Sequence, residues 1–246
     1  MNIKKRWYIK ADYEEAIKML AVTGLTFAFK RKPILDDVSF TLTDGQITGL
    51  VAPNGTGKTT LLRLLCGLLP VGQAHVLVNG IDQRQKHTQF LKQLFFLESS
   101  SNLYPDLTVQ DHLLYVKRVW QSPVDIGETV ASLGMQSYAK TRIKRLSLGM
   151  KQHALLAMYI VSNAQTMLID EPLNGLDPSS IQQFEAMFRQ LREEGKTLLV
   201  SSHQMDSVGR VCDQVFFLKN QKLDALPNDG QDMMAEYTTR FLTEAS

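Results

Sequence analysis

The stretch Gly49-Leu-Val-Ala-Pro-Asn-Gly-Thr-Gly-Lys-Thr-Thr60 combines an apolar run, a glycine-rich turn and the start of an apolar helix. Backbone N–H groups of such a turn, together with the open N-terminus of the helix, point at one spot and favour an anion there. Lys58 would reach the outer phosphates of a nucleotide, and the Thr59 hydroxyl would bind magnesium. An ordinary strand-turn-helix corner with a solvated lysine is the alternative. The nucleotide-binding residues predicted here are Asn54, Gly55, Thr56, Gly57, Lys58, Thr59 and Thr60.

One residue of this loop departs from the phosphate-loop pattern G-x-x-x-x-G-K-[ST], because Ala52 stands at the first position. The first glycine supplies backbone freedom and not a ligand. We therefore expect a slightly altered turn with nucleotide binding retained.

A second apolar run, Thr166-Met-Leu-Ile169, ends in two carboxylates, Asp170 and Glu171. Carboxylates at the tip of a buried strand are costly to bury without a cation. A parallel strand beside the phosphate loop would bring them to the magnesium, with Asp170 holding the metal and Glu171 positioning or deprotonating the attacking water. Hydrolysis needs little more than an in-line water, the metal and positive charge such as that of Lys58. A strand that merely ends in acidic loop residues is the alternative.

The elements around these residues indicate an α/β chain. Alternating apolar residues predict two short strands at 17–21 and 25–29 and a third at 38–42, which together form a small antiparallel sheet. From 99 to about 160 the pattern is helical and shows no strand signal, and Thr108 with Asp111 has the spacing of a capping box. Further strands are expected at His75–Val78, Leu94–Leu97, Thr197–Val200 and Val215–Leu218, the last of the chain.

Composition limits the classes of protein. The 246 residues carry a net charge of +2 without a long basic run, so no nucleic-acid partner is indicated. Cys66 and Cys212 are isolated thiols of the kind that suits a reducing compartment. No apolar run approaches the roughly 20 residues of a spanning helix, and the N-terminus has no signal-peptide pattern. We expect a cytoplasmic protein.

Three motifs together resemble one family, the ATP-binding subunits of ABC transporters. Leu146-Ser-Leu-Gly-Met-Lys-Gln152 resembles the family signature L-S-x-G-[QM]-x-Q, Asn174-Gly-Leu-Asp177 resembles its D-loop, and Ser201-Ser-His203 resembles its switch. The motifs occur in the family's order, and the resemblance covers about 17 to 226. It implies a P-loop NTPase of RecA-like type, with a parallel-sheet core, an antiparallel β subdomain and an inserted helical lobe.

The resemblance also implies roles for individual residues. Ser147 and Gly149 would contact the γ-phosphate of an ATP held by a second subunit, and Asp177 would cross the dimer interface. His203 would sense or stabilise the γ-phosphate near Glu171, so that Glu171, His203 and Lys58 form the catalytic set. The adenine-stacking ring of the family matches Phe29; Phe27 is the second choice, and both could instead be sheet core.

Two departures from the family stand close to the site. Ser99 occupies the position of the Q-loop glutamine, which touches the metal in the family, and Glu98 beside it could contribute a carboxylate or a water-mediated contact. His153 replaces the arginine that often follows the signature. We therefore expect a competent site, with Thr59, Asp170 and Ser99 as metal ligands, and altered coupling.

The resemblance implies a function and partners. The chain would bind and hydrolyse ATP with Mg²⁺, pair with an identical or paralogous ATP-binding subunit, and drive a separate transmembrane permease, in export, from the inner face of the cell membrane. A degenerate regulatory subunit and a non-transport ABC ATPase are the alternatives. The chromosome-maintenance ATPases need a long heptad insertion between Lys58 and Ser147, which is missing here, and no second cassette of the translation-associated type follows.

The domain boundaries follow from the same comparison. We expect an N-terminal extension at 1–16, the ATP-binding domain at 17–226 with its helical lobe at about 99–160, and a short helical tail at 227–246. Met233, Met234, Tyr237 and Phe241 fall on one face of that tail helix, which predicts packing on the core or on a partner.

Overall fold

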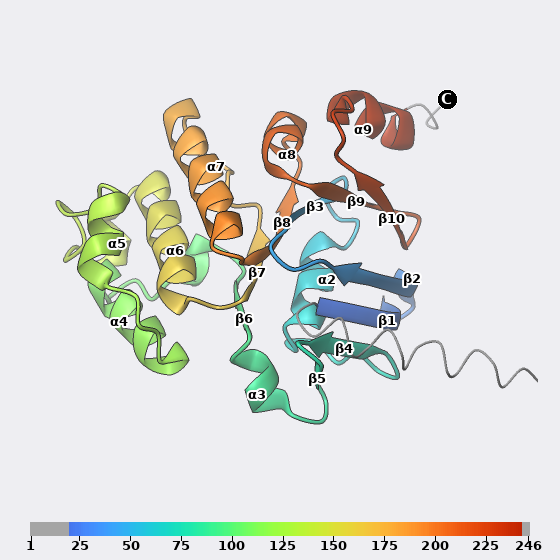
Figure 1. Ribbon diagram of the computed structural model, residues 1–246, viewed down its shortest axis with the longest axis horizontal. Helices are drawn as coiled ribbons and strands as arrows, with labels where there is room; N and C mark the ends of the chain where they lie inside the picture. The colour runs from blue at the N-terminus through green and yellow to red at the C-terminus, as the bar shows by residue number, and fades with distance from the viewer. Residues whose placement is uncertain (1–19, 243–246) are drawn as a thin grey trace, which may run out of the picture.

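A six-stranded, mostly parallel sheet lies at the centre of the computed structural model, which describes residues 20–242 (Figure 1). The strand order is β10-β9-β3-β8-β7-β6, and β10 alone runs antiparallel to its neighbour. Every residue of β3 is buried, as expected for a parallel strand covered on both faces. The strands are β3 (Ile47–Val51), β6 (Leu94–Leu97), β7 (Thr166–Asp170), β8 (Thr197–Ser202), β9 (Gln214–Lys219) and β10 (Lys222–Pro227).

A four-stranded antiparallel sheet stands beside this core, in the order β2-β1-β4-β5. Its strands are β1 (Leu20–Phe29), β2 (Lys32–Leu42), β4 (His75–Val78) and β5 (Ile81–Asp82). The prediction of two strands at 17–21 and 25–29 is wrong where it can be tested, because β1 is continuous from Leu20. The register of β1 on β2 shifts between Val22 and Leu25, around Gly24 at φ 65°. This irregularity interrupts the alternation of inward-facing and outward-facing residues, so the sequence pattern of one strand resembles that of two.

The helical lobe lies at the opposite end of the molecule from the antiparallel sheet (Figure 1). It contains α4 (Val109–Trp120), α5 (Ile126–Ser132) and α6 (Leu148–Ser162). The predicted capping box is confirmed: the Asp111 N–H donates to Thr108 Oγ1 at 3.1 Å, and the Thr108 N–H donates to Asp111 Oδ2 at 2.9 Å. These two bonds satisfy backbone donors that the first turn of α4 would otherwise leave free.

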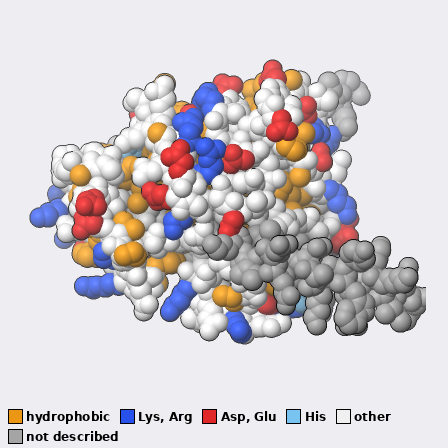
Figure 2. Space-filling model, in the orientation of Figure 1, with side chains coloured by type: hydrophobic (Ala, Val, Ile, Leu, Met, Phe, Trp, Pro, Cys, Tyr) orange, Lys and Arg blue, Asp and Glu red, His pale blue; other side chains and the backbone are white. Residues whose placement is uncertain are grey.

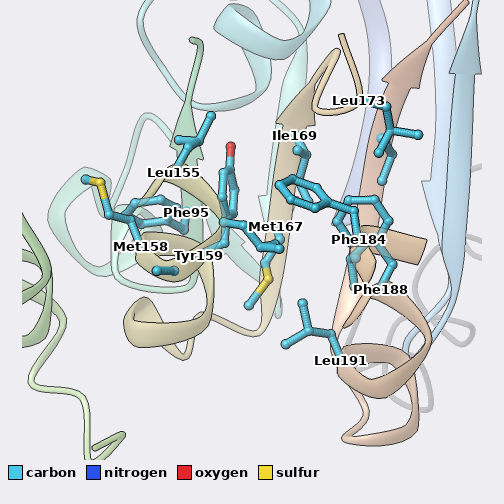
Figure 3. Close-up of a cluster of buried hydrophobic side chains, with 14 of the residues drawn as sticks. Phe95, Leu155, Met158, Tyr159, Met167, Ile169, Leu173, Phe184, Phe188 and Leu191 are labelled. Atoms are coloured by element: carbon cyan, nitrogen blue, oxygen red, sulfur yellow. The ribbon is translucent and has the colours of Figure 1, made fainter. Parts of the chain in front are cut away.

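Aromatic side chains join this lobe to the central sheet (Figure 3). Tyr159 of α6 is buried, and its hydroxyl donates to the Leu168 carbonyl at 2.6 Å and accepts the Leu97 N–H at 3.1 Å. Its ring meets Phe95 edge to face at 4.8 Å. One side chain thus ties α6 to both β6 and β7, next to the ends of those strands.

The remaining helices are α2 (Lys58–Leu65), α3 (His87–Leu91), α7 (Pro178–Glu193), α8 (Met205–Val211) and α9 (Met233–Phe241). An ion pair joins α7 to α8: the half-exposed Arg210 donates to both oxygens of the buried Glu185, at 2.7 to 3.1 Å. Charged side chains of both signs lie next to one another over these helices in Figure 2. Among residues 20–242, no helix has the length and the apolar character that crossing a bilayer requires.

The C-terminal part corrects two expectations. The strand at Val215–Leu218 is not the last, because β10 pairs with β9 after a two-residue turn. In α9, Met233 is buried and Tyr237 and Phe241 pack on the core, whereas Met234 is 51% exposed and faces away from it.

The predicted N-terminal extension at 1–16 lies outside the described residues.

Candidate functional site

The phosphate-loop stretch connects the end of β3 to α2. Gly57 has a φ of 119°, which only glycine adopts readily, and a Cβ there would lie 2.6 Å from Ile34 Cγ2. Lys58 is buried, and its ammonium donates to the Ala52 carbonyl at 2.7 Å. The loop therefore folds back over the lysine, and the Gly57 carbonyl accepts the Leu61 N–H at 2.8 Å in the first turn of α2.

Ala52 keeps the loop intact. Its side chain is fully buried in the apolar cluster below the antiparallel sheet, and it is not among the residues with positive φ. Because the backbone at this position needs no glycine, the methyl group adds packing without forcing another turn.

A cavity of about 360 Å³ opens over the loop. Eight of the predicted site residues line it: Phe29, Asn54, Gly55, Gly57, Lys58, Thr59, Thr60 and Glu171, which directly follows β7. Thr56 lies in the loop but turns inward, since its hydroxyl donates to the Pro53 carbonyl at 2.7 Å. Lys32 and Ile34 of β2 also line the cavity, and the sequence motifs did not point to either residue.

Asp170 ends β7 opposite the start of α2. Thr59 Oγ1 donates to its Oδ2 at 2.6 Å, and the Ser201 hydroxyl donates to Oδ1. Burial raises the pKa of the Asp170 carboxyl, these two hydrogen bonds act in the opposite direction, and the charge of Glu171 raises it further. A nearby cation would stabilise the charged form of this partly buried carboxylate.

The donor set fits magnesium. Mg²⁺ usually takes one or two protein ligands and completes its shell with water and phosphate oxygens, which Thr59 and Asp170 would allow. In the described part of the chain, no cluster of three or more His, Cys, Asp or Glu side chains could hold a metal by itself.

The Glu171 carboxylate lies between the Lys58 ammonium and the His203 ring. Its Oε1 makes no hydrogen bond and lies 3.3 Å from the Lys58 ammonium, and its Oε2 lies 2.9 Å from His203 Nδ1. Its backbone has φ 46°, and its N–H donates to the Ser201 hydroxyl at 2.9 Å. The structure thus brings together the three residues that were predicted to be catalytic.

Phe29 and Phe27 differ in their environment. Phe29 is 44% exposed and lines the cavity, whereas Phe27 packs against the core and meets the Phe29 ring edge to face at 4.9 Å. Of the two, Phe29 has a ring face available for stacking.

Ser147, Gly149 and Asp177 form a separate group. They line a second cavity, of about 230 Å³, which shares no lining residue with the cavity over the phosphate loop. Ser147 caps α6 and accepts the Met150 N–H at 3.2 Å, and Asp177 caps α7 through Ser179 and Ser180. Hydrogen bonds from the Ser179 and Ser180 side chains lower the pKa of Asp177. One chain therefore carries both groups but does not bring them together.

Ser99 lies in a third cavity, with Glu98, Asp170 and Glu171. Its hydroxyl accepts the Ser101 N–H at 3.1 Å and lies 3.0 Å from Ser101 Oγ, so those contacts would have to change for Ser99 to bind metal. Its role as a ligand stays a prediction. Glu98 pairs with Arg63, at 2.8 and 2.5 Å.

A glycine-rich loop between a buried parallel strand and a helix, with a lysine, a threonine and a facing acidic strand tip, defines a P-loop nucleotide-binding protein. The family model described as "ABC transporter" matches residues 35–174. The chain belongs to the ABC transporter family, as an ATP-binding subunit.

Curated relatives agree with this assignment. The chain is 32% identical over 210 residues to the ABC transporter ATP-binding protein NatA of Bacillus subtilis, covering 81% of this chain and 85% of NatA. It is 32% identical over 215 residues to the Nod factor export ATP-binding protein I of Neorhizobium galegae, covering 85% and 61% of the two chains. A lantibiotic transport ATP-binding protein, SrtF of Streptococcus pyogenes, is 28% identical over 206 residues, covering 83% and 89%.

Solved structures confirm the predicted fold class. An ATP-binding subunit of an ABC transporter superposes with a TM-score of 0.81 at 23% identity, covering 91% of this chain and 95% of that one. The ADP conformation of an ATP-binding cassette gives a TM-score of 0.78 at 18% identity, covering 92% and 97%. The core is therefore that of a P-loop NTPase with an antiparallel subdomain and a helical lobe.

Proposed function

We propose that the chain hydrolyses ATP and thereby drives a separate transmembrane permease, in export, by closing onto and opening from a second ATP-binding subunit. The observation that carries the proposal is the contact of Glu171 with both Lys58 and His203 beside the phosphate loop. A nucleotide-binding protein without hydrolysis has no need for an acid held in this way.

Binding of ATP is the first step. The N–H groups of the loop and the start of α2 surround the outer phosphates, and Lys58 supplies a positive charge that is already buried and oriented. Phe29 stacks on the adenine at the other end of the cavity. Thr59 and Asp170 would hold magnesium, which would neutralise phosphate charge when bound.

Glu171 then orients the attacking water. Its Oε1 has an unused acceptor site, and His203 and Lys58 fix the carboxylate from both sides. Ser201 holds the Glu171 backbone and the Asp170 carboxylate through one hydroxyl, so the two acids keep their relative position. The negative charge that develops on the phosphoryl group is met by Lys58 and His203.

The second group of residues completes the site of another copy. Ser147 is exposed at the N-terminus of α6, and Asp177 is exposed at the N-terminus of α7. A face-to-face dimer would place these helix starts against the phosphates that the partner holds. The partner is an identical chain or a paralogue.

The permease would dock on the helical lobe. Large apolar side chains are exposed there, among them Tyr104 at 67% and Tyr115 at 64%, and Figure 2 shows hydrophobic side chains on the surface of this lobe. Export is favoured by the relatives named for Nod factor export and lantibiotic transport. Residues 17–226 would form the ATP-binding domain and 227–246 a tail, and the permease would hold the protein at the cytoplasmic face of the membrane.

A degenerate regulatory subunit is the second candidate, because Ala52, Ser99 and His153 depart from the family pattern. Against this candidate, Ala52 does not have the positive φ that would call for glycine, and Glu171 and His203 are in contact. A regulatory subunit would bind ATP without turning it over.

The test is light scattering and ATP turnover of Glu171→Gln, with and without ATP and magnesium. We expect ATP binding to be kept, turnover to be lost and a dimer to accumulate only with ATP. Glu193→Gln, at the exposed end of α7, is the matched control and should behave as wild type. A wild-type chain that binds ATP but neither hydrolyses it nor pairs would refute the proposal in favour of the regulatory candidate.

A further inference from the structure

Two carboxylates end neighbouring parallel strands. Leu97 of β6 pairs with Ile169 of β7, so Glu98, which follows β6, comes beside Asp170, the last residue of β7. Both line the same cavity, of about 330 Å³. Asp170 belongs to the proposed metal site, and Glu98 is close enough for its charge to act on Asp170.

Helix α2 presents a different group to each of these acids. Thr59 and Arg63 are four residues apart and therefore lie on one face of the helix. Thr59 donates to Asp170 at 2.6 Å. Arg63 donates through Nε to Glu98 Oε2 at 2.8 Å and through Nη2 to Oε1 at 2.5 Å.

Arg63 binds Glu98 in a bidentate manner, and such a pair fixes the orientation of the carboxylate and also balances its charge. Both oxygens of Glu98 accept a hydrogen bond from Arg63, so the carboxylate cannot turn or move toward Asp170 without breaking a bond to Arg63. Arg63 itself is 39% exposed and Glu98 26% exposed, so the pair sits at the wall of the cavity and not in the core.

We propose that Arg63 is a positioning residue that holds Glu98 away from the cation at Asp170 and cancels its charge. This inference rests on the proposed function. With Glu98 withheld, the chain alone binds a divalent cation weakly, and the cation enters together with ATP, whose phosphates supply the missing oxygens. Without Arg63, Glu98 becomes a second carboxylate for the cation, and the cation binds before the nucleotide.

The test uses Mn²⁺ alone as the probe, with free Mn²⁺ measured by electron paramagnetic resonance in the absence of nucleotide. Arg63→Gln should bind Mn²⁺ about tenfold or more tightly than wild type, because affinity for hard cations rises with the number of carboxylates in reach. The double variant Arg63→Gln/Glu98→Gln should return to the wild-type affinity. A merely structural role for Arg63 would not be reversed by removing Glu98.

Arg192→Gln is the matched control, since Arg192 also donates to a carboxylate, Asp213, at 2.9 Å but away from the site. It should leave Mn²⁺ binding unchanged. Arg63→Met repeats the measurement with a side chain of similar length and no hydrogen-bonding group, in case Arg63→Gln folds poorly.

Unchanged Mn²⁺ affinity in Arg63→Gln and Arg63→Met would overturn the inference, and so would a double variant that binds as tightly as Arg63→Gln. A fluorescent ATP analogue tests the proposed function separately on the wild-type chain. Failure of the analogue to bind would count against the proposed function, whereas binding together with unchanged Mn²⁺ affinity would remove only the role of Arg63.

Discussion

His203 Nδ1 lies 2.9 Å from Glu171 Oε2, although the two residues follow different strands, β8 and β7. Parallel pairing of those strands, with Asp170 opposite Ser201, brings the two strand ends together. The contact fixes Glu171 on the side away from Lys58. His203 therefore acts on the same carboxylate that would orient the water.

Replacing His203 should lower turnover and leave ATP affinity nearly unchanged. His203→Ala removes one of the two groups that hold Glu171, and loss of such a group typically costs 10²–10⁴-fold in rate, on the order of general acid–base effects. The measurement is steady-state ATP turnover beside equilibrium ATP binding. His75→Ala, which removes a half-exposed histidine paired with Asp82 in the antiparallel sheet, serves as control. A His203 variant with weakened binding and normal turnover would contradict this role.

Gly57→Ala should destabilise the fold and abolish nucleotide binding. The new Cβ would meet Ile34 Cγ2 at 2.6 Å, and φ of 119° is itself strained for alanine. We expect a loss of about 2–4 kcal/mol in the free energy of unfolding, measured with urea. Gly55→Ala, at φ 80° with open space around it, carries only the backbone cost of about 1 kcal/mol. Equal losses in both variants would show that the contact with Ile34 is unimportant.

Asp170→Asn should stabilise the chain at neutral pH while removing metal-dependent hydrolysis. Burial raises the pKa of this carboxyl in the folded state above its unfolded value. The charged form therefore costs stability in full above the folded pKa, and that cost shrinks as pH falls through the folded pKa and is gone below the unfolded pKa. The variant should gain a few tenths to about 1 kcal/mol at pH 7, and the gain should shrink toward acidic pH.

Thermal unfolding across this pH range makes the measurement, repeated with magnesium and ADP. The nucleotide with its metal should raise the melting temperature of the wild type more than that of Asp170→Asn, because only binding to the folded state is stabilising. A variant that is less stable than wild type at pH 7 would show that the bonds from Thr59 and Ser201 outweigh the burial of the charge.

Phe29→Ala should weaken ATP binding without much loss of stability. Stacking of a base on an aromatic ring contributes about 1–3 kcal/mol, so the dissociation constant should rise roughly 5- to 150-fold. Phe27→Ala should do the reverse, since Phe27 packs against the core. Binding titrations and urea unfolding of both variants distinguish them, and an equal loss of affinity would show that the Phe27 ring shares the stacking.

Much of the site could be predicted from the sequence because its parts are local. Lys58 and Thr59 lie in one turn, Asp170 and Glu171 end one apolar strand, and the capping box of Thr108 needs a spacing of only three residues. Such features depend on neighbours in the chain, so a pattern reports them directly. The resemblance to a family then assigned a role to each of these residues.

Contacts between distant segments were not predictable in the same way. Nothing in the sequence near Gly57 shows that Ile34 lies against it, or that Arg63 faces Glu98. The strand β10 was missed because it is a half-exposed edge whose alternation is weak. Its turn, Asn220-Gln221, has positive φ at both residues, but it lacks the glycine that usually marks such a hairpin.

The cavity over the phosphate loop and the cavity at Ser147 share no residue, and this has a genetic consequence for the proposed dimer. A Lys58→Ala chain and a Ser147→Ala chain would each be inactive alone. In a mixed dimer, however, both lesions fall in one composite site, and the other site has an intact loop and an intact signature. Co-expression of two dead alleles should therefore restore part of the ATPase activity, whereas either allele expressed beside wild type would spoil one site in every mixed pair.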